Sequence, residues 1–428
     1  CGATQSGFGR SGSVNWQTSI KTTGFTAVSG EGYFCDTNTS GAFAVTLPAS
    51  PSAGAIVAVS DYANTFDTAN LTIGRNGSNI EGAASDFVIN AEGVALTFVY
   101  ADSTKGWIVV NSGNSSDGDV TRFVVATGGT ETIVCTNFKV HTFTGPGTFN
   151  VTCSGNTAGS STVDYMVVAG GGGGGGGHGG GAGAGGFRES PGTASGCYSV
   201  SPLGASPAVA LPVSGAMPIT VGAGGTAGRG YAAPSPSTGG VGGNSIFSSI
   251  TSTGGGGGGG YDVGDPQGLP GAGANGGSGG GGVGQVPSGP GGTGNTPSVT
   301  PSQGTNGGTA NQPGAAGGGG ATAVGSAPPG CGVGGAGGAG ATTSINGTPT
   351  ARAGGGGGGA GGGQTPGAGG SGGGGAGGAN PDPTVAGTAG STNTGGGGGG
   401  GTGGGSPGGP PFGGTGGSGI VIIRYRFQ

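Results

Sequence analysis

Charged side chains are scarce in this chain, and their scarcity excludes several classes of protein. Only 6% of the 428 residues are charged, and 11 Lys and Arg against 16 Asp and Glu leave a net charge of −5. A nucleic-acid partner is not expected, because neutralising phosphates requires a basic stripe. The longest apolar runs, Ile108–Val110 and Ile420–Ile423, are strand-sized and far short of the roughly 20 residues of a membrane span. We therefore expect no membrane insertion.

Cysteine and histidine are equally sparse, and their spacing argues against a metal or redox centre. The six cysteines include no Cys-x-x-Cys pair, and His141 and His178 stand near no cysteine cluster. No zinc site and no cofactor are expected. A disulfide between Cys197 and Cys331 is possible because both stand in non-glycine segments; free, small thiols are the alternative that the sequence leaves open.

Catalytic constellations are also missing. With two histidines in the whole chain, no Ser-His-Asp set can be assembled credibly. Asp117 with Asp119, or Asp262 with Asp265, could be read as carboxylate pairs for glycoside cleavage, but surface turns explain both more simply. The sequence therefore predicts that the protein is not an enzyme, with a polysaccharide depolymerase as the minor alternative.

What the chain does contain begins with β-structure. Residues 1–118 carry short alternating segments rich in Val, Thr, Phe and Ile, such as Ala42–Leu47 and Leu96–Tyr100, separated by Gly, Ser and Asn. This pattern predicts a β-sandwich-like module with essentially no α-helix. Residues 119–169 predict a smaller β unit, with a hairpin that joins Lys139–Phe143 to Thr148–Val151.

Glycine dominates the remainder. The chain has 125 glycines, most of them after Ala169, and 26 prolines. A flexible linker is the default reading of such a composition, and collagen would need glycine at every third position with abundant proline. We expect instead a bundle of polyproline-II-type helices across 170–418, because segments without Cβ atoms approach closely enough to exchange backbone hydrogen bonds.

This interpretation makes positional predictions. A segment enclosed on all sides must be glycine throughout, whereas a peripheral one can carry an outward side chain at every third position, as Val333, Ala336 and Ala339 do. The strands at 163–169 and 419–427 bracket the region, so we expect them to pair and 419–428 to close the β unit. The uninterrupted runs predicted to be interior are Gly170–Gly177, Gly254–Gly260, Gly354–Gly359 and Gly395–Gly401.

Segments that interrupt the glycines hold most of the chemically informative side chains. Aromatic rings can stack on sugars, while Arg and Asp add oriented hydrogen bonds. The alternative interpretation is that these segments only reverse the chain. The residues predicted to bind a receptor are Phe187, Arg188, Arg229, Tyr231, Tyr261, Asp262 and Asp265.

Three stretches carry a resemblance to a known family. Gly32–Asn111, with Gly-Tyr-Phe at 32–34 and Gly106-Trp107-Ile108-Val109, resembles repeat modules of phage tail fibres, notably from marine and cyanobacterial phages. Lys139–Phe143 with Val163–Gly177 and the terminal Gly419–Phe427 looks like the glycine-rich domain of phage tail proteins. The bundle region is similar in kind to the distal tip adhesins of T-even-like phages, whose tip loops bind host receptors.

The resemblance implies a structural, receptor-binding component of a virion tail fibre, located outside the cell. Its implied partners are a host-surface receptor, either a glycan or an outer-membrane protein, and other fibre subunits in a homo-oligomer, with a trimer favoured. Because Cys1 stands first, we expect a piece of a longer fibre, a lipidated cysteine being the alternative. A purely structural or ice-binding filament is the competing function, and it would need a flat, regular, threonine-bearing face.

Overall fold

The computed structural model describes most of the chain. No α-helix occurs in the part that it describes, so the prediction of an all-β chain is confirmed. The described residues are 14–111, 119–196, 198–205, 210–230, 237–261, 271–285, 288–311, 313–361, 363–379, 385–402 and 412–428.

The chain forms two compact units. The first comprises Cys1–Phe123 with Gly155–Ser160, and the second comprises Val124–Ser154 with Ser161–Gln428. The β unit expected at 119–169 is therefore divided between them, whereas the glycine region and the strands that bracket it belong to one body.

The first unit consists of two β-sheets around one apolar core. Alternate side chains point inward, as Val57 and Val59 do from one sheet and Leu71 and Ile73 from the other, and all four are at most 1% exposed. The strands are β1 Asn15–Lys21, β2 Phe25–Thr26, β3 Glu31–Cys35, β4 Phe43–Thr46, β5 Ile56–Asp61, β6 Leu71–Gly74, β7 Phe87–Ile89, β8 Ala95–Asp102, β9 Gly106–Val109 and β10 Asp119–Val120. The sheets have the orders β1-β3-β5-β8-β9 and β10-β7-β6-β4-β2.

The second unit begins with two further sheets. Their strands are β11 Val124–Thr127, β12 Thr130–Val134, β13 Phe138–Phe143, β14 Gly147–Ser154, β15 Thr162–Val168, β16 Phe187–Glu189, β17 Leu211–Pro212, β18 Gly215–Thr220, β19 Ser245–Phe247, β20 Ile250–Ser252 and β23 Ile420–Arg426. One sheet has the order β11-β14-β18-β19-β20, and the other has β12-β13-β23-β15-β16, with β17 also pairing with β15.

One local prediction about this unit is wrong. Residues 139–143 and 148–151 were expected to form a hairpin, but β13 pairs with β12 and β23 whereas β14 pairs with β11 and β18. The turn between them therefore carries the chain from one sheet to the other. Phe143 and Phe149 then meet in one core between the two sheets, which buries more aromatic surface than a two-stranded hairpin could.

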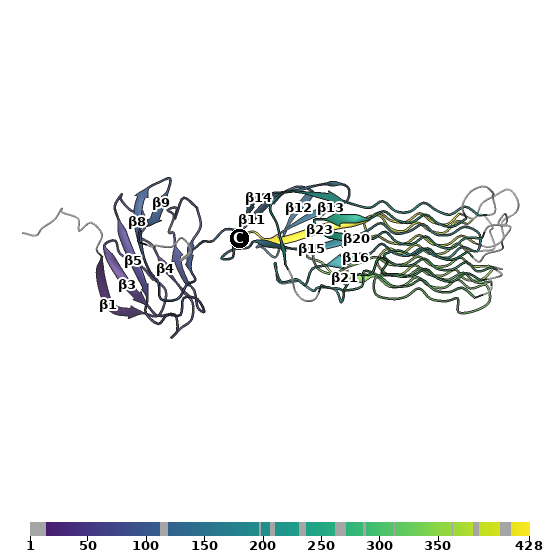
Figure 1. The fold of residues 1–428 in the computed structure, drawn as a ribbon, viewed down its shortest axis with the longest axis horizontal. Coiled ribbons are helices and arrows are strands. Elements are labelled where there is room, and N and C mark those ends of the chain that lie inside the picture. The colour runs from purple at the N-terminus through teal and green to yellow at the C-terminus, as the bar shows by residue number, and fades with distance from the viewer. Residues whose placement is uncertain are drawn as a thin grey trace, which may run out of the picture. The chain divides into compact units, whose positions relative to one another are not determined.

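The predicted clamp around the glycine region is confirmed. β15 and β23 are antiparallel neighbours, with Val168 opposite Ile420 and Asp164 opposite Arg424. Figure 1 shows β23 in yellow beside β15, where the chain enters and leaves the bundle. The whole glycine region is thus an insertion between two adjacent strands of one sheet.

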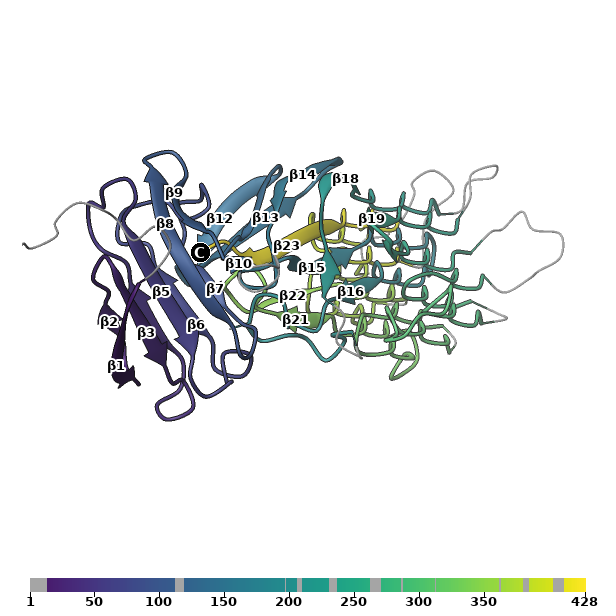
Figure 2. The same ribbon diagram turned by 60° about the vertical axis from the view of Figure 1, so that its left-hand side comes forward.

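The glycine segments bond to one another with a three-residue period. In segment 170–176, Gly171 donates its N–H to Gly417 at 2.9 Å and Gly174 donates to Gly414 at 2.8 Å, so every third residue faces the same neighbour. Three residues per turn is the repeat of a polyproline-II helix, which has no internal hydrogen bonds. The parallel traces of these segments fill the part of Figures 1 and 2 beyond the strands.

Segment 170–176 is enclosed by six such neighbours. Its N–H groups reach three segments that run in the opposite direction, represented by Gly417, Gly183 and Gly240. Its carbonyls accept from three that run in the same direction, at 225–228, 255–261 and 398–401. Every backbone N–H and C=O of segment 170–176 therefore has a partner, and an unpaired one at this buried place would cost free energy comparable to a lost hydrogen bond.

Close approach explains why these positions are glycine. A Cβ on Gly172 would overlap the carbonyl oxygen of Gly256, and one on Gly174 would overlap that of Gly399. All residues of the four uninterrupted runs are buried, as predicted. Ala336 is exposed and Val333 and Ala339 are half-buried, which also agrees with outward side chains at every third position.

The interior is not restricted to the uninterrupted runs, and that part of the expectation is wrong. Segments 180–186 and 315–321 each bond to segments on several sides and are buried. They nevertheless contain Ala182, Ala184, Ala315 and Ala316, none of which is exposed. Ala184 packs in the apolar cluster next to the sheets, so its methyl group is part of that core.

Two β-hairpins stand directly before glycine runs in the chain. β19 and β20 form a hairpin directly before Gly254–Gly260. A second hairpin, of β21 Ala341–Thr343 with β22 Thr350–Arg352, precedes Gly354–Gly359. In both cases a short pair of strands directly precedes a long glycine run.

Candidate functional site

The bundle of the second unit has two chemically different ends. At one end, here called the root, the glycine segments join β15, β16, β20, β22 and β23; the opposite end is here called the far end (Figure 1). The first reversal at the far end uses Gly177 and His178, both at positive φ (53° and 49°). The hydrogen-bonded backbone of the bundle therefore supports the side chains at the far end.

Arg229 is the predicted binding residue that the structure places most clearly at the far end. It ends segment 221–230, which leaves β18, and its side chain is exposed. The guanidinium carbon lies 5.8 Å from the ring centroid of Phe412 on the adjacent segment. A cation over an aromatic face is held in place while its outer N–H groups remain free to donate to carboxylate, phosphate or hydroxyl oxygens.

His178 and Thr402 lie together at the same end, and the sequence did not indicate this. The His178 N–H donates to the Thr402 carbonyl at 3.0 Å, and the His178 carbonyl accepts from Gly284 at 3.0 Å. Burial lowers the pKa of His178. Among the described residues, His178 Nδ1 and the fully buried Thr402 Oγ1 have no hydrogen-bond partner.

Tyr261 also reaches the far end. It follows the run Gly254–Gly260 and is half-buried, and its N–H donates to the Gly176 carbonyl at 3.3 Å. Three other predicted binding residues, Tyr231, Asp262 and Asp265, lie outside the described residues.

Phe187 and Arg188 are at the root, away from the other predicted binding residues. Both belong to β16, where Phe187 is opposite Val168 and Arg188 is opposite Val167. Phe187 is 1% exposed and packs in the apolar cluster with Val168 and Ile422. Its ring is therefore a core residue that joins bundle to sheet, and no receptor can reach it. Arg188 is half-buried.

A buried polar cluster lies at the root, and sequence reasoning missed it. Asp164 is fully buried and accepts from the Ser190 hydroxyl at 2.8 Å and the Ser195 N–H at 2.7 Å. Glu189, 2% exposed, accepts from the Ser201 N–H at 2.9 Å and from the Thr343 hydroxyl. Burial raises the pKa of Glu189. These bonds tie the loop after β16 and the β21–β22 hairpin to the sheet.

Arg424 lies next to this cluster, opposite Asp164 in the pair of β15 and β23. Its guanidinium carbon lies 4.7 Å from the Phe138 ring centroid and 5.0 Å from that of Tyr198. It donates to the Ile345 carbonyl at 3.3 Å and to the Gly196 carbonyl at 3.4 Å. The sequence signal for this cluster was present, since Asp164 and Arg424 interrupt otherwise apolar strands, and a charge inside a buried strand is rare unless it is paired.

The span of the matching family profile coincides with these strands and the bundle. The profile of the glycine-rich domain family matches residues 142–426, from within β13 to the last residue of β23. The chain belongs to the glycine-rich domain family. No curated protein matches the sequence.

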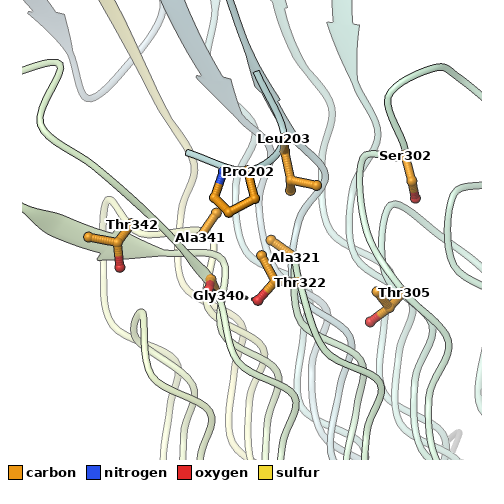
Figure 3. Close-up of a pocket in the computed structure, with 9 residues that line it drawn as sticks. All are labelled: Pro202, Leu203, Ser302, Thr305, Ala321, Thr322, Gly340, Ala341 and Thr342. Carbon is orange, nitrogen blue, oxygen red and sulfur yellow. Dashed lines mark hydrogen bonds between the residues drawn. The ribbon is translucent and has the colours of Figure 1, made fainter. Parts of the chain in front are cut away.

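The glycine-rich domain has a pocket of about 430 Å³ near the root (Figure 3). Its apolar lining comes from Pro202, Leu203, Ala321 and Ala341, which belong to three separate parts of the chain. The hydroxyl groups of one serine and three threonines and the backbone of Gly340 complete the lining, and no charged side chain is among the lining residues. A volume in the range of ~300–1,000 Å³ is typical of small-molecule sites.

The remaining predictions concern thiols, metals and membranes. Cys331 is exposed and forms no disulfide within the described residues, while Cys197 lies outside them, so their pairing stays a prediction. Asp117 lies outside them as well, and Asp119 is in β10. Within the described ranges, no group of three His, Cys, Asp or Glu side chains could hold a metal ion. No helix in this part of the chain is long and apolar enough to cross a membrane.

Proposed function

We propose that this glycine-rich domain protein is a structural and receptor-binding component of a phage tail fibre, and that the far end of its bundle contacts the host-cell receptor. The observation that carries the proposal is the exposed Arg229, stacked on Phe412 at the end of a bundle cross-linked through its own backbone. Because the bundle is already ordered, little conformational entropy is lost when a ligand binds at its end. The sequence resemblance to tail-fibre modules supports the phage assignment.

In this proposal the receptor is a host glycan or outer-membrane protein, and the chain assembles with other fibre subunits as a homo-oligomer, with a trimer favoured. The protein acts outside the cell and catalyses no reaction. Sedimentation of the full chain distinguishes a trimer from a monomer.

Attachment of the full chain to bacterial cells tests the far-end proposal. The labelled protein is titrated onto a panel of marine and cyanobacterial strains, in parallel with a double variant, Arg229→Ala with Phe412→Ala. Arg188→Ala, which removes an arginine at the root, is the matched control. The proposal expects attachment that the double variant loses by at least about tenfold and that the control retains. Equal attachment of both variants would refute it, and release of soluble sugar from the cells would favour a depolymerase.

One observation favours the second candidate, an ice-binding or purely structural filament. Thr226, Thr415 and Thr388 are exposed. They lie on three segments that are successive neighbours, since Gly416 donates its N–H to Gly225 and Gly390 donates its N–H to Thr415, each at 2.9 Å. The bundle therefore has a row of threonines that the sequence alone did not reveal. Thermal hysteresis in a freezing-point measurement, abolished by Thr415→Lys, would support this candidate over the adhesin.

A further inference from the structure

Three of the four hydroxyl groups that line the root pocket direct their protons to backbone carbonyls. The Thr305 hydroxyl lies 2.8 Å from the Gly320 carbonyl and 2.7 Å from that of Ala323. The Thr322 hydroxyl lies 3.2 Å from the Ala339 carbonyl and 3.1 Å from that of Gly340, the latter contact being visible in Figure 3. A hydroxyl has one proton and two lone pairs. Since both protons point to backbone carbonyls, these oxygens face a ligand as acceptors only.

A third hydroxyl has the same bias. Ser302 Oγ donates to the Gly304 carbonyl at 2.6 Å and also lines the pocket. A ligand that satisfies these three oxygens must supply hydrogen-bond donors, while the exposed Thr342 hydroxyl, which also lines the pocket, can donate as well as accept. An anion is disfavoured because it would meet lone pairs, and an ammonium group is disfavoured because no carboxylate lines the pocket to offset the loss of its hydration.

The apolar part of the pocket selects for shape. Pro202, Leu203, Ala321 and Ala341 present methyl, methylene and ring carbons from different segments. In Figure 3 the labelled side chains of Pro202 and Leu203 lie across from those of Ala321 and Ala341. A pyranose ring has both required features, namely C–H groups for an apolar surface and several neutral hydroxyl donors at its edge. An alkane or an aromatic ring would leave the hydroxyl oxygens without donors.

From these observations we propose that the root pocket is a binding site for a neutral saccharide of one or two pyranose units. The site is separate from the far end and does not depend on the adhesin function. It gives the glycine-rich domain a second point of contact with glycans, on the side of the bundle next to the sheets.

Saturation-transfer NMR on the full chain tests this site with simple glycosides as probes. Methyl α-glucoside and methyl β-galactoside represent the neutral class, while glucuronate and glucosamine carry a charge. We expect a neutral glycoside to bind with a Kd on the order of 1–10 mM, and the charged sugars to bind at least about fivefold more weakly. Equal binding of all four, or no binding of any, would overturn the proposal.

Two substitutions locate the binding. Thr342 is exposed at the pocket and can be replaced without touching the core, so Thr342→Trp fills the pocket and should abolish binding. Thr322→Val removes one acceptor and should weaken binding by about three- to tenfold. Thr415→Trp and Thr415→Val are the matched controls on another exposed segment, and both should bind like the parent. Full binding by Thr342→Trp would place the sugar elsewhere and refute the site.

The outcome is separable from that of the far-end experiment. Thr342→Trp should keep cell attachment, because the pocket is at the root, whereas the Arg229→Ala and Phe412→Ala double variant should keep sugar binding. If Thr342→Trp does not fold, as judged by its thermal transition, the Thr322→Val measurement with its control decides the question.

Discussion

Val168 and Ile420 are opposite each other in the antiparallel pair of β15 and β23. They are the last strand residue before the glycine region and the first strand residue after it. The chain therefore enters and leaves the bundle through one pair of adjacent strands, and the pairing of β15 with β23 holds the two ends of the glycine region together.

The clamp predicts a large effect of a single core truncation. Ile422 in β23 is 1% exposed, and Ile422→Ala should lower the free energy of unfolding of the second unit by about 2–5 kcal/mol through lost burial and a residual cavity. Ile133→Ala is the control, since Ile133 is 61% exposed in the same sheet. Chemical denaturation followed by circular dichroism measures both. A similar small loss for the two variants would contradict the importance of the clamp.

The bundle predicts that interior glycines tolerate no methyl group. Gly172→Ala would push a Cβ into the carbonyl oxygen of Gly256, and the displaced segments would lose backbone hydrogen bonds as well. We expect a loss of at least about 1–3 kcal/mol, the usual range for overpacking. Ala336→Ser on the exposed face should change stability by less than about 0.5 kcal/mol. Differential scanning calorimetry distinguishes the two, and a Gly172→Ala protein that melts with the parent would count against close packing.

The residues of the root cluster also contribute to stability, and we expect the free energy of unfolding to fall when Arg424 is truncated. Arg424→Ala removes the contacts to the Phe138 and Tyr198 rings and the hydrogen bonds to the Ile345 and Gly196 carbonyls, and it leaves a cavity in a buried strand. We expect a loss of about 2–5 kcal/mol in the free energy of unfolding. Arg426→Ala, at an exposed position of the same strand, should cost far less. Urea unfolding provides the comparison. Equal losses would mean that the buried guanidinium has no special role.

Histidine burial predicts how stability depends on pH. His141 is fully buried, with Nδ1 2.7 Å from the Gly128 carbonyl and Nε2 3.0 Å from the Tyr425 hydroxyl. Burial lowers the pKa of His141 below its ordinary value of 6.5, and that of His178 shifts the same way. The unfolded chain then binds more protons than the folded one, so stability rises with pH across the window that lies below 6.5.

Unfolding experiments at several values between pH 5 and 8 check this dependence. His141→Gln should flatten part of the slope below about pH 6.5, and the double variant with His178→Gln should flatten more of it. A slope that both substitutions leave unchanged would show that other groups cause the dependence.

Several features of the fold could be predicted from the residues because each follows from local chemistry. The uninterrupted glycine runs were correctly predicted to be interior, because a segment enclosed on all sides has little room for Cβ atoms. The three-residue spacing of Val333, Ala336 and Ala339 correctly predicted a peripheral segment. The wrong hairpin at 139–151 shows the limit of such reasoning. Adjacent strands favour local pairing, yet β13 and β14 each find better partners far along the chain, and burying Phe143 and Phe149 together decides the outcome.

The binding residues show a second limit. Phe187 and Arg229 both interrupt glycine segments and look alike in sequence, but one ends a segment at the root and the other ends a segment at the far end. The direction of each segment depends on how many reversals precede it. The sequence does not show where each glycine segment ends, so the number of reversals stays ambiguous. Phe187, which is buried at the root, therefore looks the same in the sequence as a residue at the far end.

By itself, the sequence determined that the chain is all-β, that its glycine region must be held by backbone hydrogen bonds, and that the strands at 163–169 and 419–427 close it. These conclusions follow from the absence of Cβ atoms and from the apolar strands at each side. Only the tertiary structure decided which segments adjoin, because identical glycine segments offer identical donors and acceptors and carry no register information. It also decided the assembly of the root cluster, the threonine row and the root pocket, each of which joins residues from distant parts of the chain.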